Sequence, residues 1–159
     1  MAPVASDGGR LARLIALAAP VTLLGGAYVS QYGFGLYPCE MCWWQRYALF
    51  FALPFALLAW MRPSVRSLTV MALVGILAGG LIGAFHAGVE YGWWEGLTAC
   101  TTTTNLTGGN ALDAILDAPI IRCDVAPWTL FGISLAGWNF LISVPAALLG
   151  LALLRRKEA

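Results

Sequence analysis

The sequence carries little charge for its length. Only 11% of its 159 residues are charged, 60% are hydrophobic, and the formal net charge is +1. A soluble domain of this size could not bury so much apolar surface, so the composition excludes an ordinary soluble protein. Such a charge balance does not indicate nucleic-acid binding. It predicts a membrane protein with no separate soluble domain.

Histidine and cysteine are scarce as well. The chain has one histidine, His86, and four cysteines. A zinc site commonly draws on histidine, and Cys100 and Cys123 lack a C-x-x-C spacing of their own. A c-type haem is excluded at the one C-x-x-C, because Cys42 is followed by tryptophan. We therefore expect no metal.

Four long uncharged stretches separate the few charges. A span from 43 to 61 would rise about 28 Å, roughly the thickness of a hydrocarbon core. We expect an all-α membrane protein in which residues 1–159 form a single domain, a four-helix transmembrane bundle. The predicted spans are about 12–32, 43–61, 68–89 and 137–154, and the predicted outer loops are about 33–42 and 90–136.

The basic residues predict the orientation, because retained cytoplasmic loops carry the excess of Lys and Arg. Seven of the nine cations lie at the chain ends or in one short turn: Arg10, Arg13, Arg62, Arg66, Arg155, Arg156 and Lys157. With four crossings, both termini and this turn would be cytoplasmic. All four cysteines would then lie outside.

Two local patterns refine this architecture. Gly75, Gly79 and Gly83 form a small-residue stripe in the third span, which favours close packing within the chain over homodimerisation. In the second outer loop, residues 110–117 begin with a potential capping asparagine and alternate apolar and acidic faces. This pattern predicts a short amphipathic helix on the membrane surface.

The C-x-x-C motif is the strongest chemical signal. Cys39 and Cys42 lie at the start of the second span, and we expect Cys42 just before the helix. Helix amides and Arg46, four residues on, would both lower the pKa of the Cys42 thiol. Arg46 is also an ionisable residue within a span, which makes it a functional candidate, with a lipid-headgroup anchor as the alternative.

His86 falls at the outer end of the third span, on the face of Gly83. It therefore points into the bundle. One interpretation is a buried imidazole with its hydrogen bonds satisfied. The other is that it binds a polar cofactor head near Arg46 or relays a proton.

Four outward cysteines admit three disulfide connectivities, so the residues alone do not determine the pairing. Two structural disulfides that staple the loops remain an alternative to a redox role.

In combination, these motifs resemble the disulfide bond formation protein B (DsbB) family of bacterial inner membranes. The resemblance runs almost end to end and rests on the four spans, on Pro38-Cys39-x-x-Cys42-x-x-x-Arg46-x-Ala48-Leu49, on the His86 to Cys100 approach, and on Cys123 before Trp128-x-x-Phe131-Gly132-Ile133-Ser134. Many members have an acidic residue before the arginine, where this chain has Gln45.

The resemblance implies a thiol:quinone oxidoreductase of the bacterial inner membrane, with both termini cytoplasmic and the cysteines periplasmic. A periplasmic DsbA-like thioredoxin-fold protein would be the partner, and ubiquinone or menaquinone the acceptor. The implied relay passes from Cys100 and Cys123 to Cys39 and Cys42, and Cys42 would meet the quinone beside Arg46, with His86 near.

Two other classes remain open. A vitamin K epoxide reductase-like protein also combines a four-helix bundle with a C-x-x-C, although there the motif is expected late in the chain. A non-enzymatic membrane protein with stapled loops would use its cysteines for stability alone.

Overall fold

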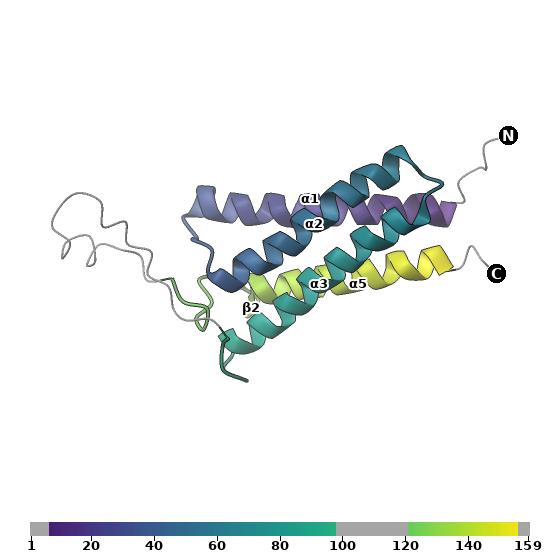
Figure 1. Cartoon of the computed structure of the whole chain (residues 1–159). Coiled ribbons are helices and arrows are strands. Elements are labelled where there is room, and N and C mark those ends of the chain that lie inside the picture. Colours follow the sequence, from purple (N-terminus) through teal and green to yellow (C-terminus); the bar gives the residue numbers. More distant parts are fainter. Residues whose placement is uncertain (1–6, 98–120, 156–159) are drawn as a thin grey trace.

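Most of the described chain is helical (Figure 1). The computed structural model describes residues 7–97 and 121–155. Within them lie four helices, α1 (Asp7–Phe34), α2 (Glu40–Met61), α3 (Arg66–Glu90) and α5 (Leu135–Arg155), and two short strands, β1 (Thr129–Leu130) and β2 (Ile133–Ser134). Each predicted span falls inside one helix. The amphipathic helix predicted at 110–117 lies outside the described residues.

The helices differ in how well they suit a membrane. Within the described ranges, α1, α3 and α5 are long and apolar enough to cross a bilayer. Helix α2 has 22 residues, but it carries the polar residues Gln45 and Arg46 within its apolar sequence. Both side chains are buried in the bundle. The helices support a multi-pass membrane protein, and a fourth crossing by α2 stays a prediction.

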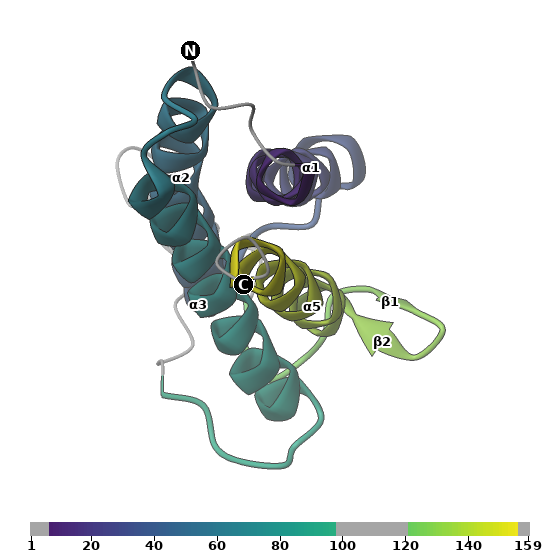
Figure 2. The same ribbon diagram turned by 90° about the vertical axis from the view of Figure 1, so that its right-hand side faces the viewer.

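Helix α3 has the most extensive contacts of the four described helices. It packs extensively against α2 and α5, and α1 covers α5 and α2 from the other side (Figure 2). The core contains small side chains such as Ala16, Ala52 and Ala56 around the larger Leu73 and Ile76. Small residues let the helix axes approach closely, which favours van der Waals packing where lipid offers no hydrophobic driving force.

The glycines of α3 contact helices of the same chain, as predicted. A Cβ atom on Gly75 would lie 3.0 Å from the Ala52 Cβ, and one on Gly79 would lie 3.4 Å from the Ala48 Cβ. Gly80, outside the predicted stripe, is tighter: its Cβ would lie 2.8 Å from the Ser143 Cβ of α5. The α3 glycines thus serve two helix interfaces.

Gly80→Ala is therefore expected to destabilise the bundle. The new methyl group would force α3 and α5 apart, whereas Gly25→Ala in α1 adds a methyl group that meets nothing within 4 Å. Both substitutions gain the same helix propensity, so the stability difference between them isolates the overpacking cost, about 1–3 kcal/mol. Unfolding of both variants in mixed detergent micelles measures it, and equal stabilities would contradict the packing described.

A short antiparallel hairpin positions the start of α5. Strands β1 and β2 pair through a tight turn in which Phe131 and Gly132 both have positive φ angles of 52° and 76°. The Tyr91 hydroxyl donates to the Gly132 carbonyl at 3.0 Å and accepts from the Ser134 amide at 3.1 Å. Tyr91 thereby ties the end of α3 to the beginning of α5.

Candidate functional site

The two cysteines of the C-x-x-C lie at the N-terminus of α2. Cys39 is the N-cap residue, and its sulfur accepts a hydrogen bond from the Cys42 amide at 3.2 Å. Because this cap lets the helix begin at Glu40, Cys42 lies in the first turn, and its expected position just before the helix is wrong. Both cysteines are free thiols here.

The two sulfur atoms are in direct contact. The Cys39 thiol donates a hydrogen bond to the Cys42 sulfur at 2.8 Å. This bond and the burial of the side chain raise the pKa of Cys39 well above its usual range. Cys39 therefore keeps its proton and, through this hydrogen bond, lowers the pKa of Cys42. The direction is the one expected for Cys42, but the main cause is the contact with Cys39 and not Arg46.

Arg46 is held by protein groups inside the bundle. Its guanidinium donates to the Gln31 Oε1 at 2.6 Å and to the Ala27 carbonyl at 3.1 Å. Its Cζ lies 5.0 Å from the ring centres of both Tyr28 and Trp43, a distance suited to cation–π contact. With an exposure of 6%, the side chain does not extend toward lipid headgroups.

Cys42 and Arg46 line one cavity between α1, α2 and α5. Its volume is about 310 Å³. The walls are mostly apolar, for example Leu23 and Ile142, and the polar groups come chiefly from Arg46, Gln45 and Asn139. A mainly apolar pocket with a few convergent polar groups is the usual form of a small-molecule site.

His86 lies on the other side of Cys42. It is 1% exposed and lines a second cavity of about 440 Å³, together with Cys39, Cys42 and Glu90. Its Nε2 atom is 3.5 Å from the Cys39 sulfur and 3.8 Å from a Glu90 carboxylate oxygen. The structure thus brings Cys42 together with Arg46 in one cavity and with His86 in another.

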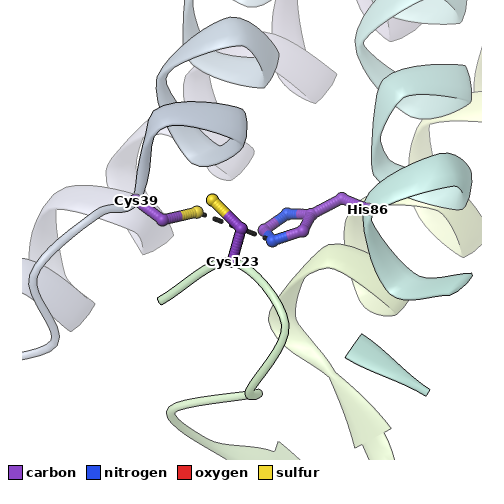
Figure 3. A group of neighbouring side chains, drawn as sticks. All are labelled: Cys39, His86 and Cys123. Atoms are coloured by element: carbon purple, nitrogen blue, oxygen red, sulfur yellow. Dashed lines mark hydrogen bonds between the residues drawn. The ribbon is translucent and has the colours of Figure 1, made fainter. Parts of the chain in front are cut away.

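Cys123 approaches this second cavity from the loop that precedes β1. Its sulfur, the Cys39 sulfur and a His86 ring nitrogen all lie within 4.8 Å of one another (Figure 3). The two sulfur atoms are close enough for thiol exchange. Two sulfurs and a ring nitrogen at this spacing could also bind a metal ion, so the absence of a metal stays a prediction. Cys100 lies outside the described residues.

A chain of buried polar side chains supports the site, and sequence reasoning missed most of it. Gln45 contacts His86 on α3 and Asn139 on α5, and Asn139 contacts Ser143. Glu90 is buried beside His86, and one of its oxygens has no hydrogen-bond partner. The available signal was the polarity of these residues inside or next to apolar spans, because polar groups in a membrane segment are expensive unless paired.

The chain is similar to known proteins over most of its length. A family model described as "Disulfide bond formation protein DsbB" matches residues 9–153. The chain belongs to the DsbB family. Members of this family are disulfide bond formation proteins of the membrane, so the chain has an oxidoreductase role in disulfide formation.

Individual relatives agree. A protein named disulfide bond formation protein B from Polaromonas sp. is 32% identical, covering 92% of this chain and 90% of the relative. Its namesake from Verminephrobacter eiseniae is 34% identical over 92% of this chain and 86% of the relative, and that from Acidovorax sp. is 32% identical over 92% and 87%. No solved structure matches the chain significantly.

Proposed function

We propose that this DsbB-family protein is a thiol:quinone oxidoreductase that re-oxidises a periplasmic DsbA-like protein and thereby sustains disulfide bond formation. The observation that carries the proposal is the position of Cys42, which lines both cavities. On one side lie the other described cysteines and His86, and on the other side lies Arg46. A single sulfur atom can thus take part in thiol exchange and in electron transfer to a bound acceptor.

The first cavity has features that fit a quinone. Its apolar walls suit an isoprenoid-bearing ring, and Arg46 has N–H groups beyond those bound to Gln31 and Ala27 that it can offer to a ring oxygen. A bound quinone supplies an acceptor for two electrons and two protons. Arg46 would bind and orient the ring, and its charge would stabilise negative charge on a ring oxygen. Whether the quinone is ubiquinone or menaquinone does not follow from this lining.

The cysteine cluster supports the order of thiol exchange. The thiolate of the reduced partner would attack the Cys100–Cys123 disulfide at Cys100. The freed Cys123 would then attack Cys39 in the closed inner pair, so that a Cys123–Cys39 bond forms and the Cys39–Cys42 bond breaks. Cys42 leaves with the electron pair as a thiolate, the state that its contact with Cys39 favours.

In this proposal the membrane position follows the charge pattern. Both termini would lie in the cytoplasm and the cysteines at the periplasmic face of the bacterial inner membrane, where a soluble DsbA-like partner reaches them. The quinone would enter the first cavity from the lipid.

Arg46→Ala tests the quinone site. Loss of a charged donor should raise the quinone KM about tenfold or more, since a charge-assisted hydrogen bond contributes roughly 1.5–3 kcal/mol. The assay follows quinol formation by purified protein with quinone and a reduced DsbA-like partner. Arg46→Lys, which keeps the charge and loses the planar fork, should lie between wild type and Arg46→Ala.

Arg10→Ala is the matched control. Arg10 is exposed near the N-terminal end of α1, whereas Arg46 contacts Ala27 and Gln31 near the C-terminal end. It should leave the quinone KM unchanged. If Arg46→Ala also leaves KM and kcat unchanged, Arg46 is a structural residue and the first cavity is not the quinone site.

A further inference from the structure

The hydrogen-bond donors and acceptors among the buried polar side chains can be assigned, because one of their partners is a backbone carbonyl, which can only accept. The side-chain nitrogen of Asn139 lies 3.1 Å from the Gly79 carbonyl, a group that only accepts. The Asn139 oxygen lies 2.8 Å from the Ser143 hydroxyl, which donates to it. The orientation of the Asn139 amide follows from this pair of contacts.

The orientation of the Gln45 amide follows in the same way. The Asn139 nitrogen also donates to the Gln45 oxygen at 2.7 Å. The Gln45 nitrogen therefore faces the other way, where it donates to the Met41 carbonyl at 3.2 Å and lies 2.9 Å from the Nδ1 atom of His86. An amide nitrogen only donates, so Nδ1 must accept. A neutral imidazole that accepts at Nδ1 carries its proton on Nε2.

The Nε2 side of His86 presents acceptors. The Cys39 sulfur is 3.5 Å away, and a Glu90 carboxylate oxygen is 3.8 Å away. Cys39 directs its own proton to Cys42, which leaves its lone pairs available to His86. Both neighbours thus suit an N–H donor at this position.

We propose that Gln45 is a positioning residue that holds His86 in the neutral form with its proton on Nε2, so that His86 donates a hydrogen bond to the Cys39 sulfur and takes up no proton at Nδ1. The use of this donor rests on the proposed function. The N–H would stabilise the partial negative charge that develops on the Cys39 sulfur while Cys123 attacks it and Cys42 leaves. His86 then lowers the cost of that charge without transferring a proton.

Other ionisable groups around His86 favour its protonated form, against the effect proposed for Gln45. Glu90 from α3 and the thiols of Cys39 and Cys42 line the same cavity as the ring, Arg122 lines it from the loop, and Cys123 adjoins it. Negative charge on Glu90 or Cys42 favours an imidazolium. Protonation of Nδ1 would require the Gln45 amide to reverse, and this would set its nitrogen against the nitrogen of Asn139.

The single histidine makes the ring state directly measurable. Protein labelled with ¹⁵N-histidine and purified with a histidine-free tag gives one pair of ring nitrogen signals, because the chain has only His86. In the reduced wild-type protein near neutral pH, we expect a protonated Nε2 and an unprotonated Nδ1. A ring protonated at both nitrogens, or at Nδ1 alone, would overturn the proposal.

Two substitutions at Gln45 test its role. Gln45→Glu replaces the donor by an acceptor, so His86 should be protonated at both nitrogens at a pH where wild type carries one proton. Gln31→Glu is the control: it adds the same carboxylate in α1, next to Arg46, and should leave the His86 signals unchanged. If Gln45→Glu leaves the ring singly protonated on Nε2, or if Gln31→Glu changes it equally, Gln45 does not set the ring state.

Gln45→Met keeps the proposal testable if the charged variant does not fold. Without the donor, the ring should populate both neutral tautomers, and the Nδ1 signal should shift accordingly. A ring that stays fixed with its proton on Nε2 would contradict the role of Gln45. These spectra need neither quinone nor partner. The proposal for Gln45 can therefore fail while the thiol:quinone activity is confirmed, and it can hold while that activity is absent.

Discussion

Cys42→Ser is expected to abolish sustained quinol formation, with a loss of about a thousandfold or more. Among the described cysteines, Cys42 is the one that shares a cavity with Arg46, and Cys39 and Cys123 lie on the far side of it. A serine hydroxyl cannot form the disulfide or carry the thiolate at this position. The assay is the partner-driven reduction of quinone described above.

The same variant should still react once with its partner. Cys100 and Cys123 remain, so a reduced DsbA-like protein should be oxidised to a single equivalent, or be trapped as a mixed disulfide, and then stop. A non-enzymatic, stapled membrane protein predicts the reverse, a loss of stability with no effect on electron flow to quinone. Repeated turnover by Cys42→Ser would contradict the proposed role of Cys42.

The helical layout was predictable because it depends on local patterns. Long uncharged stretches and the charges between them indicate where helices begin and end, and each predicted span falls inside an observed helix. The start of α2 was not predictable at the level of one residue. It depends on Cys39 acting as the N-cap, a role that serine, threonine, asparagine or aspartate normally performs.

Family membership was also predictable, since it rests on short motifs whose spacing is visible in the chain, and the family model confirms it. Cys42 and Arg46 are four residues apart on one helix, so their shared cavity follows from helical periodicity. The four crossings and the helix at 110–117 stay predictions.

The position of His86 shows what local patterns cannot provide. Periodicity correctly turned it into the bundle, where it is 1% exposed. Whether it lies with Arg46 or with Cys39 depends on which helices neighbour α3 and on how α2 crosses it. The contacts of Gln45 with His86 and Asn139 join three helices, and the polarity of these residues within apolar spans does not indicate which of them meet.

Cys123→Ser is expected to separate the two halves of the relay. Quinol formation driven by the DsbA-like partner should fall to background, because electrons from Cys100 would have no thiolate to carry them to Cys39. Quinol formation driven by dithiothreitol should persist. A small dithiol can reach the inner pair through the second cavity, which Cys39 and Cys42 both line and which is about 440 Å³ in volume.

The two reductants therefore distinguish a carrier from a structural role. Cys123 is buried and lies close to Cys39 and His86, so its replacement could also disturb the inner pair itself. In that case the dithiothreitol-driven rate would fall together with the partner-driven rate, and Cys123→Ala, which omits the hydroxyl group, would repeat the result. If both variants keep the small-dithiol rate and lose only the partner-driven rate, Cys123 acts by carrying electrons between the two cysteine pairs. Retention of the partner-driven rate would instead require the partner to reduce Cys39 and Cys42 directly, and the outer pair would then have no part in the reaction.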